Sequence, residues 1–499
     1  MKHIVLIIFG ILILSCQGEK KNEASDLKVD QRPNIIWLMA EDISTDLGSY
    51  GMAGVKTPHL DQMASEGMRF TNCFVTSPIC SPSRSAMMTG THQVKINAHH
   101  HRSNRDVPLS GPYKPFTYWL REAGYTCILG HHGVLGKGRK TDVNFKHQKT
   151  GSWDGIAHFG LFDKLDNFDP VDAPFFAQIQ LNASHRGDWW DRIRSESENQ
   201  VNTDDIDLPP YYATHPAIKL DWAKYLDQIE YVDGEVGMIL QELEDKGLAD
   251  NTIVIFIGDN GRCNLRGKGY LHDPGLRVPL IIKGGKDIKQ GTVTDQVVSA
   301  TDITATILNL AQVEIPAYMT GSSFLSADFN REEVYAARDL WDEIEEQSRA
   351  VVTDRWKYIR NDMPEVPWDA HQAYLDFFRP AVHVMRQLKD MGKLDGHQEK
   401  FFSSRKPVEE LYDLQNDPFE LYNLVPDITY EPTLEMMRIK LNEYEVAMTP
   451  VSDIYKPIVP KAVDILEWVK AEKPELYQQM LVGKEIGFQG LAAEFRRRK

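Results

Sequence analysis

Residues 251–261 read Asn-Thr-Ile-Val-Ile-Phe-Ile-Gly-Asp-Asn-Gly and predict the fold of the chain. Their continuous apolar run, rich in β-branched residues, is typical of a strand that is buried on both faces. Residues 34–39 and 174–181 have the same form, and they run into Glu41-Asp42 and His185. The ligand crevice of a parallel sheet lies at the carboxyl ends of its strands. We therefore expect these polar side chains, which can bind a metal or move protons, to meet at one edge.

Helical patterns lie between the predicted strands. Apolar residues recur at helical spacing from Trp222 to Leu243, with Gly247 as a C-terminal stop. Thr57 and Pro58 predict a second helix with a Thr cap and Pro in its first turn. Alternating strands and helices predict an α/β sandwich with a mainly parallel central sheet flanked by helices.

The chain reads differently after residue 329. Short antiparallel strands are predicted there, followed by helical stretches; the strands are residues 334–337, 350–353 and 356–359, and the helices are residues 369–394, 434–447 and 462 onward. We predict a catalytic domain over residues 32–329 and a smaller C-terminal α+β subdomain over residues 330–499.

The N-terminus has the parts of an export signal. Lys2 and His3 precede an apolar run over residues 4–14 that is too short to span a bilayer comfortably. Its ending at Ser15 and Cys16 resembles a bacterial lipobox, in which the Cys is lipidated and becomes the mature N-terminus. We predict a lipoprotein signal peptide over residues 1–16, a solvated tether over 17–31, and an exported protein that is periplasmic or lipid-anchored at the outer membrane. A plain signal peptide cut nearby is the alternative.

Composition excludes some classes of protein. The 499 residues include 42% hydrophobic residues, enough for a sizeable core, and carry a net charge of -16. An acidic chain argues against nucleic acid as a partner, because nucleic-acid binding needs basic surfaces. An anionic substrate would have to be held by a local cationic pocket.

The sharpest chemical motif is Cys80-Ser-Pro-Ser-Arg84. Pro82 suits a first helical turn, and the helix is predicted to continue through Met88 to a stop at Gly90. Cys80 would then lie at the helix entrance, where free backbone N–H groups favour an anion. Taken alone, this position suggests either a thiolate nucleophile of low pKa or a buried structural Cys.

The motif and its continuation, Ser85-Ala-Met-Met-Thr-Gly90, resemble the signature of the type I, formylglycine-dependent sulfatases of the alkaline phosphatase superfamily. The resemblance extends in order along most of the chain after Gln31; it includes residues 32–36, 57–61, 258–261, 275–280, 411–414 and 417–418. It is nearest to a branch that contains heparan N-sulfatase-like and polysaccharide sulfatases. The implied fold is an alkaline-phosphatase-like sandwich.

The resemblance implies a covalent mechanism. Cys80 is converted to formylglycine by a maturation enzyme, and one hydroxyl of the hydrated aldehyde attacks sulfur. The second hydroxyl then loses its proton, so that sulfate is expelled by C–O cleavage. The implied metal ligands are Glu41, Asp42, Asp259, Asn260 and the modified Cys80. Oxygen donors suit Ca²⁺ or Mg²⁺ rather than Zn²⁺, and the family favours Ca²⁺.

Other polar residues take roles by the same resemblance. The implied catalytic residues besides Cys80 are Arg84, Lys140, His185 and Lys268, and either His185 or Lys268 could protonate the leaving oxygen. Glu41 is the less usual member of its pair, because many relatives have Asp there. Residues expected to bind substrate are His100, His101, Lys137, His272 and Arg338.

The segment before Lys140 departs from the family pattern. Relatives usually have Gly-Lys-x-His soon after a Gly-Tyr pair, whereas this chain has an apparent insertion over residues 131–139 and then Lys140-Thr-Asp142. We expect Lys140 to be the active-site Lys and keep Lys137 as the alternative. Asp142 stands where others have His, which leaves open which group assists the final expulsion of sulfate.

The predicted function is hydrolysis of sulfate esters on a carbohydrate, such as ulvan or a glycosaminoglycan, in which the sequence does not distinguish O- from N-linked sulfate. One alternative is a phosphonate monoester or phosphodiester hydrolase of the same superfamily. Another is a non-catalytic surface lipoprotein that binds sulfated glycans through an unused site.

Overall fold

The computed structural model describes residues 32–151, 160–286, 288–342, 344–448, 462–482, 484 and 486–498. The predicted signal peptide, the lipidation site Cys16 and the tether over residues 17–31 lie outside the described residues. Residues 32–499 form one compact unit. No helix among the described residues is both long and apolar enough to cross a membrane.

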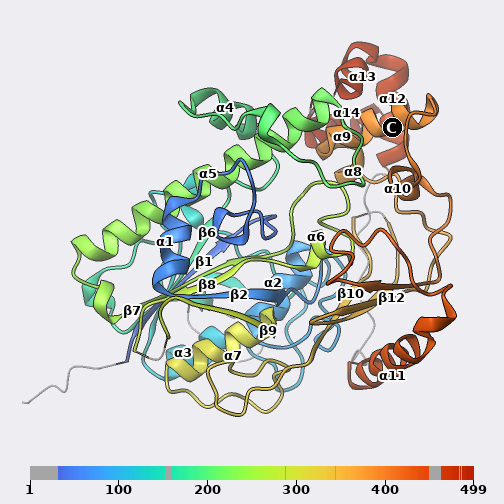
Figure 1. Ribbon diagram of the computed structural model, residues 1–499. Coiled ribbons are helices and arrows are strands. Elements are labelled where there is room, and N and C mark those ends of the chain that lie inside the picture. The colour runs from blue at the N-terminus through green and yellow to red at the C-terminus, as the bar shows by residue number, and fades with distance from the viewer. Residues whose placement is uncertain are drawn as a thin grey trace, which may run out of the picture. The chain divides into compact units, whose positions relative to one another are not determined.

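A seven-stranded sheet forms the centre of this unit (Figure 1). Its order is β3 (Thr126–Leu129), β6 (Phe175–Leu181), β1 (Asn34–Ala40), β7 (Thr252–Gly258), β8 (Leu280–Lys283), β2 (Met68–Phe74) and β9 (Thr292–Ser299). Among these strands β8 alone is antiparallel to its neighbours. The three predicted strands are β1, β6 and β7, adjacent and parallel at the middle of the sheet, as expected for strands buried on both faces.

Helices cover both faces of this sheet. Ile36 and Leu38 of β1 pack into a core that contains residues of α1 (Pro58–Glu66) and α5 (Pro216–Asp245). Ile35 and Trp37 of the same strand pack into a second core, with residues of α2 (Cys80–Thr89), α3 (Phe116–Glu122) and α7 (Ala300–Leu310). Alternate residues of a strand point to opposite faces. The predicted sandwich is therefore confirmed.

The two predicted helix boundaries at Thr57 and Gly90 differ in outcome. Thr57 precedes α1 and Pro58 occupies its first turn, but the Thr57 side chain makes no capping bond to the helix. Its hydroxyl instead donates to Asp61 and accepts from the Gly48 N–H. The predicted Thr cap is therefore wrong. Gly90 ends α2 in the left-handed conformation, with φ 62°, as the sequence predicts.

A smaller antiparallel sheet follows in the C-terminal part, with the order β10 (Glu333–Arg338), β11 (Ser348–Thr353), β12 (Trp356–Asn361) and β13 (Glu409–Asp413). Three of these strands are predicted, and β13 is not. Helix α11 (Glu431–Ala447) packs against this sheet. The α+β character of this part is confirmed, whereas the exact division at residue 330 stays a prediction.

The predicted helix over residues 369–394 is two helices, α8 (Ala373–Phe378) and α9 (Pro380–Asp390). Arg379 between them has φ -127° and ψ 76°, outside the helical region. The cause is Pro380, whose ring disfavours a helical conformation in the preceding residue.

The remaining elements connect or extend these layers. They are β4 (Gln148–Thr150), β5 (Gly160–Phe162), α4 (Trp189–Glu196), α6 (Asp273–Leu276), α10 (Gly396–Glu399), α12 (Ala462–Glu472), α13 (Pro474–Leu481) and α14 (Phe488–Arg498).

The strands at the middle of the sheet are buried along their whole length. Ile179 of β6 is fully buried, whereas Ile428 is 78% exposed. We expect Ile179→Ala to lower the free energy of unfolding by about 2–5 kcal/mol, because it removes buried methyl groups and leaves a cavity. Ile428→Ala is the matched control and should change it little. Denaturant unfolding of both variants measures the difference, and equal losses would contradict this description of the core.

Candidate active site

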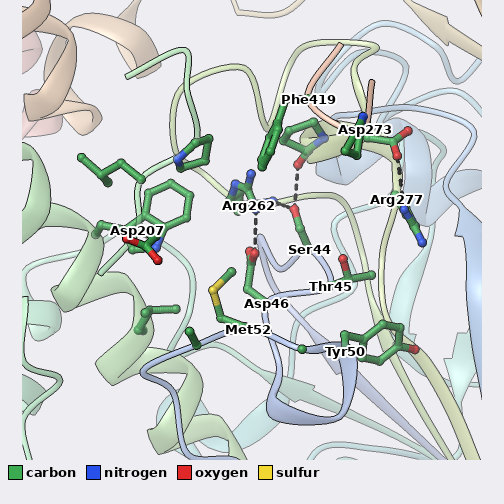
Figure 2. A pocket seen from close by; sticks show the side chains of 18 of the residues that line it. Ser44, Thr45, Asp46, Tyr50, Met52, Asp207, Arg262, Asp273, Arg277 and Phe419 are labelled. Carbon is green, nitrogen blue, oxygen red and sulfur yellow. Dashed lines mark hydrogen bonds and ion pairs between the residues drawn. The ribbon is translucent and has the colours of Figure 1, made fainter. Parts of the chain in front are cut away.

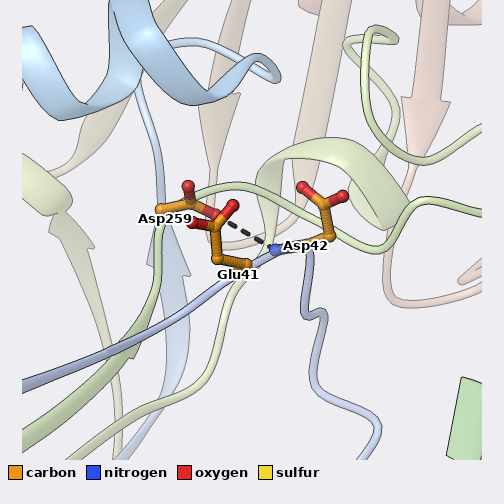
Figure 3. A group of neighbouring side chains, drawn as sticks. All are labelled: Glu41, Asp42 and Asp259. Carbon is orange, nitrogen blue, oxygen red and sulfur yellow. Dashed lines mark hydrogen bonds between the residues drawn. The ribbon is translucent and has the colours of Figure 1, made fainter. Parts of the chain in front are cut away.

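The ends of two central strands bring three carboxylates together. Glu41 and Asp42 directly follow β1, and Asp259 directly follows β7. The parallel register pairs Ala40 with Gly258, so the residues that follow them are neighbours. One carboxylate oxygen from each acid lies within 4.8 Å of the others, and all three residues are buried (Figure 3). Such a group of like charges requires positive partners.

The backbone at this edge is unusual. Asp42 has φ 47°, a region that non-glycine residues adopt rarely and at a cost of about 1 kcal/mol or more. The Asp42 N–H donates to Oδ1 of Asp259 at 3.1 Å. Gly261 passes so close to Pro274 that a Cβ would lie 2.0 Å from the Pro274 carbonyl oxygen. Glycine at position 261 is thus required by close approach of the two segments.

Arg84 of α2 is one of the positive partners. Its Nε donates to Oδ2 of Asp259 at 2.8 Å, and its Nη2 donates to Oε1 of Glu41 at 3.3 Å. Its Nη1 is buried and makes no hydrogen bond with any described residue. Arg84 therefore holds two of the acids and keeps one N–H group available for an anion.

Two lysines balance the other charges. Nζ of Lys140 lies 2.6 Å from Oε2 of Glu41, and Nζ of Lys268 lies 2.6 Å from Oδ1 of Asp42. Burial disfavours both carboxylate anions, but the nearby cations outweigh it: Lys140 holds the pKa of Glu41, and Lys268 holds that of Asp42, below the usual range. Both acids are therefore ionised.

The donor set fits a hard divalent cation. Burial raises the pKa of Asp259 to about 6, and the charges of Glu41 and Asp42 add to the effect although Arg84 opposes it. Oδ1 of Asn260 is buried and accepts no hydrogen bond from any described residue, while its amide N–H₂ donates to Asp42 and Gly261. Carboxylate and amide oxygens are ligands of Ca²⁺ and Mg²⁺. A cation here would relieve the repulsion and satisfy the amide oxygen.

Cys80 is the first residue of α2 and is 1% exposed. Burial raises the pKa of its thiol to about 11. The prediction of a low-pKa thiolate is therefore wrong: desolvation outweighs the helix start and the nearby Lys268 and Lys140. The Cys80 Sγ atom instead lies 3.7 Å from Nε2 of His101. His101, which is predicted to bind substrate, is itself buried and lies beside the Cys80 side chain.

His185 lies in the loop after β6, with its Nε2 4.0 Å from Oε2 of Glu41. Burial lowers its pKa to about 4, so the ring is neutral. Its Nδ1 donates to the carbonyl of Arg186 at 3.0 Å. The Trp190 indole donates to the His185 carbonyl at 2.8 Å and fixes this loop.

Of the two candidate lysines, the structure brings Lys140 to the carboxylates. Lys137 is exposed, has φ 58° and makes no side-chain bond with any described residue. Asp142, which follows Lys140, forms ion pairs with Arg105 and, at 3.8 Å, with Arg102. Lys137 of the insertion is therefore exposed, whereas Lys140 directly after the insertion contacts Glu41.

Three other predicted substrate-binding residues lie elsewhere. His100 accepts from the Leu340 N–H at 3.1 Å. His272 is buried, with Nε2 3.4 Å from Glu410. Arg338 is buried, and its Nη2 lies 2.7 Å from Oε2 of Glu346. None of the three has a bond to the acids or to Cys80 in the described part of the chain, so their roles stay predictions.

Two residues of the site have no local sequence signal. Tyr374 of α8 donates its hydroxyl to Oδ2 of Asp42 at 2.9 Å, and the Lys268 ammonium lies 4.9 Å from its ring centre. Asp342, after β10, bonds to Nδ1 of His101 at 2.9 Å. Both reach the site from the C-terminal part, across more than two hundred residues of sequence.

A cavity of about 530 Å³ lies beside the loops that follow β1 and β7 (Figure 2). Inside it, the Arg262 guanidinium pairs with Asp46 at 2.7 Å, and the Arg262 N–H donates to the Ser44 hydroxyl at 2.9 Å. These bonds join the two loops a few residues beyond the acids. Among the described residues that line the cavity, none is a predicted catalytic residue.

The fold and site together define a hydrolase of the alkaline phosphatase superfamily, and comparisons with known proteins identify the family. The family model "Sulfatase" matches residues 33–313, and "N-sulphoglucosamine sulphohydrolase, C-terminal" matches residues 261–372. An ulvan-active sulfatase of Formosa agariphila is 32% identical, over 89% of this chain and 81% of its own length. Human N-sulphoglucosamine sulphohydrolase is 27% identical, over 83% and 89%.

A solved structure agrees in fold. A 2-O GAG sulfatase superposes with a TM-score of 0.57 at 18% identity, over 84% of this chain and 92% of its own. The chain therefore belongs to the type I sulfatase family, and it is a sulfuric ester hydrolase.

Lys137 of the insertion and Lys140 directly after the insertion provide a matched test of the site. We expect Lys140→Ala to lower kcat for sulfate ester hydrolysis about 10²–10³-fold, because it removes a half-buried positive group that contacts the buried Glu41. Lys137→Ala should leave kcat unchanged, because Lys137 is exposed. Steady-state kinetics of both variants, with melting temperatures as a check on folding, decide the assignment. A larger loss of kcat in Lys137→Ala than in Lys140→Ala would instead identify Lys137 as the active-site lysine.

Proposed function

We propose that this sulfatase hydrolyses sulfate esters on an oligosaccharide or polysaccharide, such as ulvan or a glycosaminoglycan. The observation that carries the proposal is the similarity over most of the chain to an ulvan-active sulfatase. The site agrees with it, because buried acids lie beside Arg84, whose Nη1 has no hydrogen-bond partner among the described residues. The second relative, named for an N-sulphoglucosamine substrate, keeps N-linked sulfate open as a target.

Residue 80 carries the nucleophile in this proposal, after a maturation enzyme has converted Cys80 to formylglycine. The hydrated aldehyde supplies one hydroxyl that attacks sulfur and a second whose deprotonation allows sulfate to leave. The Cys80 thiol is buried and protonated, so the unmodified side chain is a poor nucleophile. Modification therefore has a chemical reason at this position.

We assign Ca²⁺ to the acidic group, with Mg²⁺ less favoured. Glu41, Asp42, Asp259 and Asn260 would hold it, together with residue 80. The cation supplies charge that lowers the pKa of the nucleophilic hydroxyl and neutralises sulfate oxygens. It would also balance the negative charges of Glu41 and Asp42, which Lys140 and Lys268 balance in its absence.

The other residues bind sulfate and move protons. The unpartnered Nη1 of Arg84 and the ammonium groups of Lys140 and Lys268 are assigned to sulfate oxygens. Lys268 is charged, whereas His185 must first take up a proton because its pKa is about 4. This difference favours Lys268 as the group that protonates the leaving oxygen and leaves His185 to bind the sulfate ester.

Export and membrane anchoring through lipidated Cys16 belong to the same proposal. Extracellular polysaccharide is too large to enter a cell unaided, so an enzyme of this kind acts outside the cytoplasm. The support is the N-terminal sequence alone: an apolar run over residues 4–14 followed by Ser15-Cys16. Metabolic labelling with a fatty acid, lost in Cys16→Ala, would test the anchor.

Release of sulfate from defined substrates tests the proposed function. We expect protein with an aldehyde at residue 80, measured by intact mass, to release sulfate from a panel of O- and N-sulfated oligosaccharides. Cys80→Ala should fold normally and lose turnover entirely, because it lacks the nucleophile.

The same panel decides between the alternatives. Faster hydrolysis of aryl phosphonate monoesters or phosphodiesters than of every sulfated substrate would favour the phosphonate hydrolase. A persistent thiol at residue 80 in the native host, with binding to sulfated glycans but no turnover, would favour a non-catalytic binding protein.

Removal of divalent metal tests the acidic group. Chelation should abolish sulfate release, and Ca²⁺ should restore it more completely than Mg²⁺. Asn260→Ala should weaken Ca²⁺ binding, measured by calorimetry, because it removes the unpartnered amide oxygen. Full activity after thorough chelation would require a different role for these acids.

A further inference from the structure

His101 forms a chain of contacts between residue 80 and a carboxylate. Its Nε2 lies 3.7 Å from the Cys80 Sγ atom, and its Nδ1 lies 2.9 Å from Oδ1 of Asp342. His101 belongs to the loop after α2, and Asp342 to the bend after β10. His101 is 4% exposed. The three groups therefore form a chain of contacts in which Cys80 and His101 are buried and Asp342 is half-buried.

The hydrogen bond to Asp342 decides which nitrogen of the His101 ring carries the proton when the ring is neutral. An ionised carboxylate only accepts hydrogen bonds, so the proton of the neutral ring is on Nδ1, facing Asp342. Nε2 then presents its lone pair toward residue 80. A base that a third group orients in this way is the arrangement by which enzymes activate nucleophilic side chains.

The backbone holds this arrangement firmly. The His101 N–H donates to the Leu340 carbonyl at 2.9 Å, which ties its loop to the bend that carries Asp342. The Arg102 N–H donates to the Ser81 hydroxyl at 3.0 Å, which ties the same loop to the start of α2. Both partners of His101 are thus fixed relative to it.

Other ionisable groups nearby are less suited to accept a proton from residue 80. Lys140 and Lys268 are already protonated and pair with carboxylates. Asp142 pairs with Arg105 and lies 3.5 Å from the Lys140 ammonium. Among the described residues, His101 is the neutral base in contact with the Cys80 side chain.

We propose that His101 is a catalytic residue that accepts a proton from the hydrated side chain at residue 80, and that Asp342 is its positioning residue. The inference rests on the proposed function. After sulfate has been transferred to residue 80, the remaining O–H proton moves to Nε2 and its electron pair re-forms the C=O bond. The C–O bond to the sulfate group breaks at the same time, and sulfate leaves with the electron pair of that C–O bond. The proton on His101 then passes to water, and addition of water to the aldehyde restores the diol.

The proposal predicts which step fails in a variant. His101→Ala and His101→Gln should still release the alcohol once per enzyme, but sulfate should remain on residue 80 and be visible in the intact mass. We expect kcat to fall about 10²–10⁴-fold, the usual contribution of a positioned acid or base. Added imidazole should restore part of the turnover of His101→Ala. His59→Ala, an exposed histidine of α1, is the matched control.

Asp342 has its own test. Asp342→Asn suits the left-handed backbone at this position, where φ is 52°, and removes the charge that orients the ring. We expect kcat to fall with KM unchanged. In the unmodified Cys80 protein, ¹⁵N NMR should show the proton of His101 on Nδ1, and the population of that tautomer should decrease in Asp342→Asn.

The outcomes are distinguishable. Turnover of His101→Gln within about twofold of the parent enzyme, with the aldehyde present and no sulfate retained, would overturn this inference while the proposed function stands. A parent enzyme with the aldehyde that releases no sulfate from any substrate would overturn the proposed function itself. Melting temperatures and the mass of residue 80 are measured for every variant, so a loss of folding or maturation is recognised.

Discussion

The site depends on one constraint: the buried carboxylates of Glu41, Asp42 and Asp259 have oxygen atoms within 4.8 Å of one another. Like charges at such distances repel strongly where water is excluded. The chain meets this with three cations from separate segments: Arg84 from α2, Lys140 from the segment after the insertion and Lys268 from the loop after β7. Arg84 bonds to Asp259 and Glu41, Lys140 bonds to Glu41, and Lys268 bonds to Asp42. Removing one partner would leave a buried charge unpaired, so the cations and acids must be kept together.

The same balance suits a site for a cation and an anion at once. A divalent ion adds positive charge among the acids, and a sulfate group adds negative charge beside the cations. The cation would bind the unpartnered Asn260 oxygen. The sulfate group would accept a hydrogen bond from the unpartnered Nη1 of Arg84. Helix α2 connects the two halves, because it carries both Cys80 and Arg84 one turn apart.

The C-terminal part contributes more than a cover to the sheet. Tyr374 contacts Asp42, and Asp342 orients the histidine that contacts Cys80. Arg379 donates to the Cys263 carbonyl at 2.6 Å and to the Lys268 carbonyl, so it also holds the loop that carries Lys268. The site is therefore completed by segments that follow the strand ends by more than eighty residues, and the two parts of the chain form one functional unit.

The sequence by itself determined the elements whose signals are local. Continuous apolar runs marked β1, β6 and β7, and the polar residues directly after them were the acids and His185, because parallel strands end at a common edge. Pro82 and Gly90 marked α2, because Pro suits the first turn of a helix and Gly suits the position after its end. Pro380 also carried a local signal, but the periodicity of the flanking residues concealed the break between α8 and α9.

Only the tertiary structure decided what depends on contacts between distant segments. The Thr57 hydroxyl bonds to the Gly48 N–H and to the Asp61 side chain instead of capping a backbone N–H of α1. Burial, which no motif records, raised the pKa of Cys80 where the helix start alone suggested a lower one. The sequence alone does not distinguish Lys137 from Lys140 as the active-site lysine. The folded chain places Lys140 beside Glu41 and leaves Lys137 exposed to solvent. His101 and Asp342 are 241 residues apart, so folding alone makes them partners.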